Sequence, residues 1–79
     1  MTLYFFDTFE NGEHIVDDAG LECCSFEHMR LEAMKALPAI AKDEIPKDGD
    51  RQAFTVLVKN EAGKSVYSAT LTYAGLRLG

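Results

Sequence analysis

The adjacent cysteines Cys23 and Cys24 and the nearby His28 are the side chains best suited to metal binding or redox chemistry. Cys24 and His28 lie four residues apart near the expected start of a helix, where the helix dipole favours a thiolate. A structural zinc site, however, needs four ligands at separated spacings, and a thioredoxin-type pair has two residues between its cysteines. We therefore expect both cysteines to be reduced and packed in the core, with no metal or cofactor.

Four acidic residues, Asp7, Asp17, Asp18 and Glu22, cluster around the first expected hairpin. Paired carboxylates can transfer protons or bind a hard cation. The expected hairpin register, however, places Asp7 and Asp17 on opposite faces, and Asp18 belongs to a segment of typical turn composition. The sequence also has no loop of alternating oxygen ligands, no Gly-rich phosphate loop and no nucleophile elbow. We therefore predict no catalytic residue and a protein that is not an enzyme.

The charge balance disfavours nucleic acid as a partner. Thirteen acidic and eight basic residues give a net charge of −5, and no segment concentrates Lys and Arg. Phosphate neutralisation, the main source of nucleic-acid affinity, is therefore poorly supplied. The N-terminal region lacks the basic and apolar segments of a signal peptide, and no segment approaches the ~18 apolar residues of a membrane span. We expect a cytoplasmic protein without a membrane partner.

The length of 79 residues predicts a single domain over residues 1–79. A hydrophobic fraction of 47% with 27% charged residues is ordinary for a folded globular protein. A chain of this size buries only about 60–65% of its unfolded surface, so self-association would add a large share of its stability.

Residues 25–45 are expected to form the one helix, because apolar residues recur there at steps of three and four. The predicted core stripe of this helix is Phe26, Met29, Ala33, Leu37 and Ile40. Ser25 is the candidate N-cap. Pro38 would cost on the order of 3 kcal/mol inside a straight helix, so we expect a kink or a break there, and Pro46 is expected to end the helix at Ile45.

The remaining segments predict two β-hairpins, one on each side of the helix. The first has strands at 2–9 and 14–17 and a type I′ turn at Asn11-Gly12. The second has strands at 52–59 and 65–73, and a four-residue loop that pairs Lys59 with Lys64. We therefore predict an α+β fold of ββαββ type, with the helix on one face of a four-stranded, mostly antiparallel sheet. The strand order is left open; in one arrangement the first and last strands are parallel neighbours.

Strand alternation puts apolar side chains on both faces of this sheet. The face expected to contact the helix carries Tyr4, Phe6, Ile15, Phe54, Val56, Val58, Tyr67, Ala69, Leu71 and Tyr73. The opposite face carries Leu3, Phe5, Phe9, Val16, Leu57 and Val66. One helix can cover only one face, and large exposed apolar patches usually mark interaction surfaces. We predict self-association as a homodimer through the second face, or contact with an unidentified protein partner. Two other arrangements stay open: the six side chains lie apart, or the tail 76–78 covers them.

A second functional hypothesis is a module that binds a small ligand or single-stranded nucleic acid. Phe5 and Phe9 would then act as stacking surfaces, as aromatic side chains on sheets do for bases. The acidic charge of the chain opposes the nucleic-acid form of this hypothesis.

The chain also resembles a family of small bacterial proteins of unknown function. The resemblance lies in Tyr4-Phe5-Phe6-Asp7, in Asp17-Asp18-Ala19-Gly20, in the helix residues Glu32-Ala33 and Ala36-Leu37, and in the strand 54–58 that leads to Asn60-Glu61-Ala62-Gly63. It implies a single ββαββ-type domain and brings no catalytic residues. Pro38 and the Cys23-Cys24 pair are departures from the family pattern.

Overall fold

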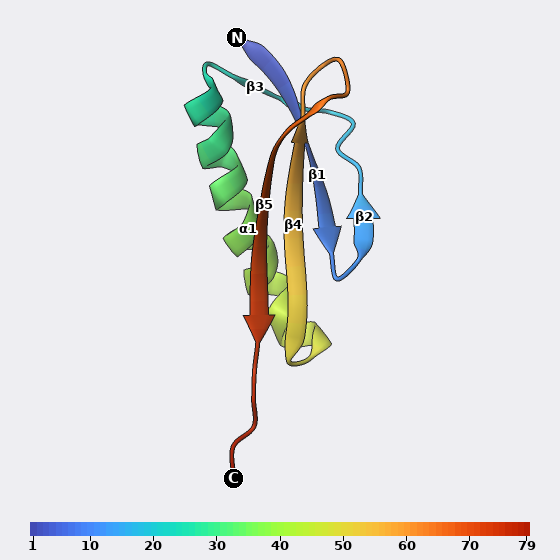
Figure 1. The fold of residues 1–79 in the computed structure, drawn as a ribbon, viewed down its shortest axis with the longest axis vertical. Helices are drawn as coiled ribbons and strands as arrows, with labels where there is room; N and C mark the ends of the chain where they lie inside the picture. The colour runs from blue at the N-terminus through green and yellow to red at the C-terminus, as the bar shows by residue number, and fades with distance from the viewer.

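The computed structural model describes the backbone of residues 1–79 and the side chains of residues 1–47 and 49–79. Within them the chain forms one helix that lies along one face of an antiparallel sheet of five strands (Figure 1). The elements are β1 (Thr2–Glu10), β2 (Glu13–Ile15), β3 (Leu21–Cys23), α1 (Phe26–Asp48), β4 (Arg51–Lys59) and β5 (Ser65–Ala74). The predicted α+β class is confirmed, with one strand more than the four expected.

The strand order is β2-β1-β4-β5, and β3 also pairs with β1. The two hairpins meet through β1 and β4, which are antiparallel, with Phe6 opposite Val58. The arrangement in which the first and last strands are parallel neighbours is therefore wrong. β4 takes the central position because Phe54, Val56 and Val58 can be fully buried only there.

The first hairpin has the predicted turn and register. Asn11 and Gly12 have φ values of 53° and 89°, as a type I′ turn requires, and Phe9 lies opposite His14. β2 ends at Ile15, however, so the second strand of this hairpin is shorter than the expected 14–17. The unpredicted strand β3 pairs with the N-terminal part of β1. β2 and β3 therefore follow one another along the same edge of β1.

The second hairpin has the predicted faces but a different register. Lys59 lies opposite Ser65 instead of Lys64, and an irregularity follows, after which Val58 lies opposite Tyr67. From there on the register differs from the prediction by two residues, an even number, so each side chain of β5 keeps its face. Val66 lies at the irregularity and packs against the hydrophobic core, so its predicted place on the opposite face is wrong.

Helix α1 begins where the sequence predicts it and ends later. The Ser25 hydroxyl accepts a hydrogen bond of 3.0 Å from the His28 amide, which confirms the N-cap. The helix continues through Pro38 and Pro46 to Asp48, so the predicted end at Ile45 is wrong and no break occurs at Pro38. Pro38 and Met34 lie on the exposed side of the helix, where water can bind the Met34 carbonyl that Pro38 leaves unbonded. Where side chains are described, no helix combines the length and apolarity needed to cross a membrane.

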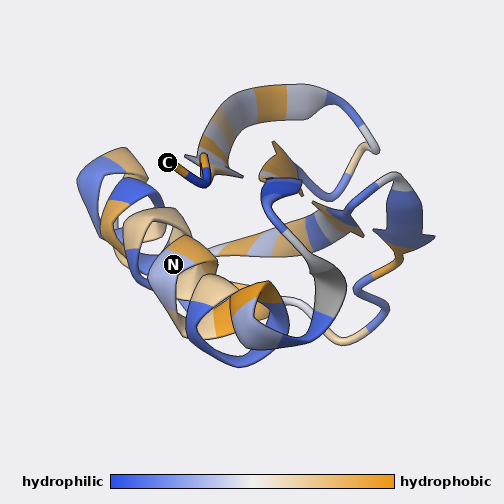
Figure 2. Cartoon of the chain, turned by 90° about the horizontal axis from the view of Figure 1, so that it is seen from below, coloured by the Kyte–Doolittle hydropathy of each residue, from blue (hydrophilic) through white to orange (hydrophobic). Residues whose placement is uncertain are grey.

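The core lies between α1 and β4, with further contacts to β5 and β3 (Figure 2). Its buried apolar residues are Cys23, Met29, Ala33, Leu37, Ala41, Phe54, Val56 and Val58. Met29, Ala33 and Leu37 confirm the predicted stripe, whereas Ala41 is buried more deeply than Ile40 and Phe26 remains 47% exposed beside Tyr67.

Three residues that the sequence assigns to the helix-facing side are poorly covered. Ile15 is 44% exposed, because β2 lies beyond β1 while α1 lies over β4 and β5. Leu71 and Tyr73 on the outermost strand β5 are 36% and 38% exposed. One helix therefore covers the centre of this face and leaves its margins accessible.

The exposed proline in the middle of α1 gives a test of the helix. Because Pro38 lacks the amide that would bond to Met34 and packs little, Pro38→Ala should raise the free energy of unfolding by about 1–3 kcal/mol. Urea denaturation followed by circular dichroism measures this change. A loss of stability would contradict a regular helix across this position.

Candidate functional site

The candidate site is the face of the sheet that points away from α1, which we call the outer face. Register and alternation place there Leu3, Phe5, Asp7 and Phe9 of β1, Thr55, Leu57 and Lys59 of β4, and Ser68, Thr70 and Thr72 of β5. The half formed by β1 is mainly apolar. The half formed by β5 carries hydroxyl groups, and those of Thr55 and Thr70 are 2.9 Å apart. The outer face is thus divided into an apolar part and a hydroxyl-rich part.

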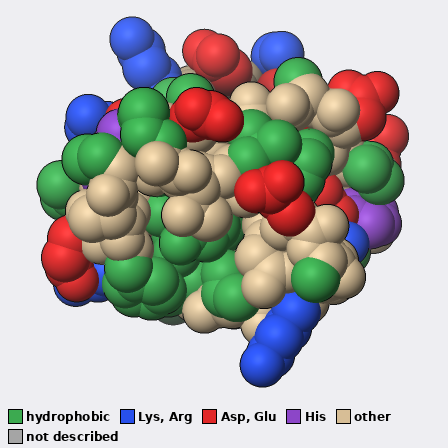
Figure 3. Space-filling model, turned by 90° about the horizontal axis from the view of Figure 1, so that it is seen from above, with side chains coloured by type: hydrophobic (Ala, Val, Ile, Leu, Met, Phe, Trp, Pro, Cys, Tyr) green, Lys and Arg blue, Asp and Glu red, His purple; other side chains and the backbone are tan. Residues whose placement is uncertain are grey.

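Most of the predicted association surface does lie on this face. Leu3, Phe5, Phe9 and Leu57 are partly buried side chains of its apolar part, and we call these four residues the outer-face patch. Val16 lies just beyond the end of β2 and is 63% exposed. Val66 is the one predicted member that packs against the core instead. At the end of the molecule seen in Figure 3, hydrophobic side chains reach the surface between acidic ones.

A buried carboxylate, that of Asp7, lies at the centre of the outer face. Asp7 is 1% exposed, and its Oδ2 lies 3.0 Å from both His14 Nε2 and Lys59 Nζ. Its Oδ1 accepts a hydrogen bond of 3.0 Å from the Asp17 amide. These groups come from β1, from β2, from β4 and from the turn after β2, so one side chain connects four parts of the chain.

Hydrogen bonds and charge hold Asp7 in its ionised form. Desolvation of the buried carboxyl opposes ionisation, but the bonds from the Asp17 amide, Lys59 and His14, together with the charge of Lys59, outweigh it. The pKa of Asp7 is therefore lowered from 3.8 to about 2. Asp7 carries its charge at neutral pH and is a poor general base.

The carboxylate of Asp17 binds a backbone amide on the edge of β1 that neither β2 nor β3 reaches. Its Oδ2 accepts a hydrogen bond of 3.0 Å from the Phe6 amide, which lies on the edge of β1 between the segments that pair with β2 and β3. Its Oδ1 accepts bonds of 3.1 Å from the amides of Ala19 and Gly20. Burial raises the pKa of Asp17, but these three backbone bonds outweigh it and the net pKa is lowered.

Asp7 and Asp17 are therefore linked by two reciprocal hydrogen bonds, each between a carboxylate and a backbone amide. Asp17 donates its amide to the Asp7 carboxylate, and its own carboxylate binds the amide of the residue before Asp7. We call this arrangement the aspartate pair. The expected hairpin register, which sets the two side chains on opposite faces, does not reveal this link, because it runs through backbone amides and Asp17 lies beyond the end of β2.

Gly20 lets the turn after β2 approach the outer face. Its φ is +76°, and a Cβ atom there would lie 3.0 Å from Leu3 Cδ1, 3.1 Å from Phe5 Cε1 and 3.1 Å from the Tyr4 carbonyl oxygen. A side chain at this position would therefore face both a strained backbone and a close contact. The turn covers one end of the outer-face patch.

His14 covers part of the patch from the other end. Its ring stacks on Phe9 with a centroid distance of 4.4 Å and an interplanar angle of 9°. The same ring binds Asp7 through Nε2, so stacking and hydrogen bonding fix one orientation. One face of the Phe9 ring is therefore occupied within the chain.

The polar groups of this site are bonded to one another. In the part of the chain with described side chains, no buried side-chain nitrogen or oxygen lacks a partner, and no group of three His, Cys, Asp or Glu residues could hold a metal ion. The arrangement joins β1, β2 and β4 through hydrogen bonds to one ionised carboxylate, that of Asp7.

The cysteines have two different environments. Cys23 is fully buried, and desolvation, followed by the nearby charge of Glu32, raises the pKa of its thiol. Packing in the core, as predicted, therefore describes Cys23. Cys24 is exposed, which corrects that prediction for this residue, and its amide donates a 3.0 Å hydrogen bond to His28 Nδ1. Both cysteines are free.

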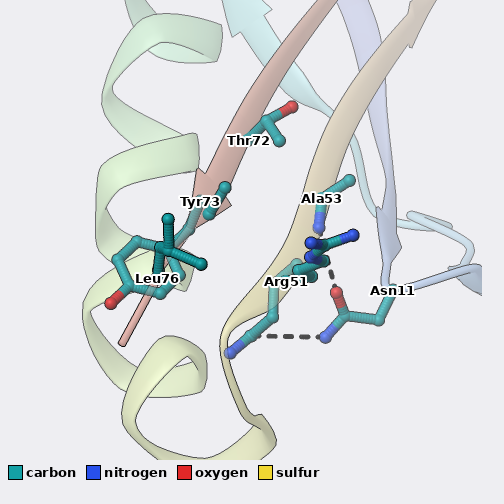
Figure 4. A pocket seen from close by; sticks show the side chains of 9 residues that line it. Asn11, Arg51, Ala53, Thr72, Tyr73 and Leu76 are labelled. Atoms are coloured by element: carbon teal, nitrogen blue, oxygen red, sulfur yellow. Dashed lines mark hydrogen bonds between the residues drawn. The ribbon is translucent and has the colours of Figure 1, made fainter. Parts of the chain in front are cut away.

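A separate, open hollow of about 620 Å³ lies where β4 begins and β5 ends (Figure 4). Arg51, Thr72, Tyr73 and Leu76 are among its lining residues. Asn11 lies beside it and binds the Ala53 amide through its side-chain oxygen at 3.0 Å. The hollow is shallow and is bordered by the exposed end of the chain, so it forms a weaker candidate than the outer face.

Sequence reasoning missed the two side chains that bind Asp7, His14 and Lys59. His14 could have been found, because a two-residue turn at Asn11-Gly12 pairs Phe9 with His14 and so puts His14 on the strand next to Asp7. Lys59 could not, because it lies 52 residues away and meets Asp7 only through the pairing of β1 with β4.

The fold and this site define a small α+β domain with one helix-covered face and one face without a helix. No curated protein and no solved structure matches the chain. The model of one protein family, described as a domain of unknown function (DUF6894), matches residues 3–72. The chain belongs to this family, which confirms the resemblance to a family without an assigned activity.

The lowered pKa of Asp7 predicts how stability depends on pH. The unfolded carboxyl has a pKa near 3.8, so the ionised form stabilises the fold above that value, and this contribution is lost as the pH falls towards 2. Asp7→Asn should lower the free energy of unfolding by about 2 kcal/mol at pH 7 and flatten its decline below pH 4. Urea denaturation at several pH values measures both effects. Parallel curves for the two proteins would contradict this role.

Substituting two glycines with positive φ distinguishes the effect of backbone strain from the effect of a close contact. Gly20→Ala should destabilise the domain by at least about 1 kcal/mol more than Gly12→Ala, because a Cβ at Gly12 meets no atom within 4 Å. Thermal unfolding of the two variants gives the comparison. Equal losses would show that the turn after β2 does not press on Leu3 and Phe5.

Proposed function

We propose that this chain is a non-enzymatic, cytoplasmic protein-interaction module that associates with a second copy through the outer face. One observation carries the proposal: in the described part of the chain no helix or strand packs over the outer-face patch, although four large apolar side chains lie there. α1 is engaged on the other face, and the turn after β2 and His14 cover only the two ends of the patch, so the rest of it would gain cover from another molecule.

The charges of the outer face favour a second copy as the partner. Asp7 and Lys59 neutralise each other within the face, so two such faces can meet without repulsion. A two-fold interface brings the same patch together from both chains and removes apolar area from water twice. For so small a domain, this buried area is large relative to the apolar area that one chain can bury in its own core.

The free cysteines support a reducing compartment. Cys24 is exposed and unpaired, and small secreted domains usually pair their cysteines in disulfides. This is the basis for proposing the cytoplasm.

The alternative, a module that binds a small ligand or single-stranded nucleic acid through Phe5 and Phe9, has less support. His14 already stacks on Phe9, and the net charge of −5 repels phosphate. Binding of single-stranded RNA that weakens with added salt would favour this alternative over self-association.

Light scattering tests the proposed interface. Wild-type protein should have a mass of at least twice the 8.8 kDa of one chain, and Leu57→Lys should halve the assembly by placing like charges across the two-fold axis. Leu57 lies opposite Asp7, so a lysine there is compatible with the folded chain. Ala39→Lys, which adds the same charge on the exposed side of α1, is the control and should leave the mass unchanged.

Two results would contradict the outer-face interface. One is a wild-type protein that remains monomeric at the highest concentration reached. The other is a folded Leu57→Lys variant, checked by circular dichroism, that keeps the wild-type mass.

A further inference from the structure

The two edges of the sheet differ in how they are covered. Along β1, the strands β2 and β3 pair with successive segments of the outer edge, and Asp17 binds the Phe6 amide between them. At the opposite end of the sheet, no strand among the described residues pairs with the outer edge of β5. The sheet therefore ends on one side in two separate strands of three residues each, β2 and β3, and on the other side in the continuous ten-residue strand β5.

The edge formed by β5 lacks the usual protection against pairing. Natural edge strands carry lysines, prolines, inward charges or bulges that prevent association with another strand. The segment from Ser65 to Leu76 contains no charged residue and no proline, in a chain with 21 charged residues. The one irregularity lies near Val58 and Lys59, so the ladder along most of β5 is regular.

The register identifies the backbone groups that point outward. The Gly75 amide donates to the Asp50 carbonyl, which continues the pairing of Ala74 with Arg51. Backbone groups alternate in direction along a strand, so those of Ser68, Thr70 and Thr72 point away from β4. These outward groups form a row along the free edge.

Apolar side chains next to this edge are also incompletely covered. Leu71 and Tyr73 lie on the helix side, yet they are 36% and 38% exposed because α1 lies mainly over β4. A strand added beside β5 would cover them. Backbone pairing and apolar burial therefore favour the same occupant, an extended strand.

We propose that β5 of a second copy of this chain pairs antiparallel with β5, giving one continuous sheet through two chains. An antiparallel pair of identical strands is two-fold symmetric, and neither strand carries a charge that repels the other. The outer edges of the joined sheet are then formed by the three-residue strands β2 and β3 of each chain, which are too short to offer a further chain a continuous edge, so the assembly closes at two chains. An edge of another protein offers no such closure.

This proposal is independent of the outer-face interface. The two-fold axis of an antiparallel strand pair is perpendicular to the sheet, so both helices stay on one side and both outer faces on the other. Outer-face patches from two chains are then accessible together. The two interfaces use different residues and can be tested one at a time.

Thr72→Pro tests the edge. The proline removes an outward-pointing amide and crowds an added strand, while the bonds between β5 and β4 remain. In light scattering, Thr72→Pro should have half the wild-type mass, and Thr72→Ala, the matched control, should keep it. In the Leu57→Lys background, a mass of twice 8.8 kDa should remain, and adding Thr72→Pro should reduce it to one chain. A folded Thr72→Pro variant with the wild-type mass would overturn the proposal.

Hydrogen exchange of the wild-type protein tests the same edge without a substitution. The amides of Ser68, Thr70 and Thr72 should exchange about tenfold more slowly, or slower still, in concentrated than in dilute protein. The amides of Ala69 and Leu71, which point to β4, serve as the internal reference. Two results would overturn the proposal. One is exchange of the outward amides that does not depend on protein concentration. The other is slow exchange of these amides only after a different protein is added to the purified chain.

Discussion

The reciprocal binding of Asp7 and Asp17 is the interaction on which the rest of the structure depends. Asp7 is a carboxylate buried in a face of the sheet, where an unpaired charge would strongly destabilise the fold. The Asp17 amide, His14 and Lys59 satisfy it, and Asp17 in turn binds the Phe6 amide. The pair therefore fixes three strands and the turn after β2 at once, with few residues and a small core.

The same arrangement divides the surface into regions with different roles. The edge of β1 is occupied by β2, β3 and Asp17, and the inner face by α1. The outer-face patch and the edge of β5 remain available for another chain. A domain of this size would gain stability from such contacts, which is why we propose that these two surfaces carry its function.

Local features could be predicted from the sequence. Asn11-Gly12 determined the first hairpin register, the Ser25 hydroxyl marked the start of the helix, and the alternation of Phe54, Val56 and Val58 gave the core face of β4. Each of these depends on residues close together in the chain.

Features that depend on distant residues could not be predicted. The pairing of β1 with β4 brings Lys59 to Asp7 across 52 positions, and no local pattern specifies it. β3 was missed because three residues are too few to show alternation. The helix passes through Pro38 because its packing against β4 outweighs a cost that the sequence alone would assign to a break. The site therefore required the three-dimensional structure.

A double-mutant cycle of Asp7→Asn and Asp17→Asn tests the central interaction most directly. Each single variant and the double variant would be unfolded in urea at pH 7, and the free energies compared. If the two aspartates act as one unit, the double variant loses less stability than the sum of the singles, with a coupling of about 1 kcal/mol or more. Losses that add to within about 0.3 kcal/mol would show that the two residues act separately and would contradict this account.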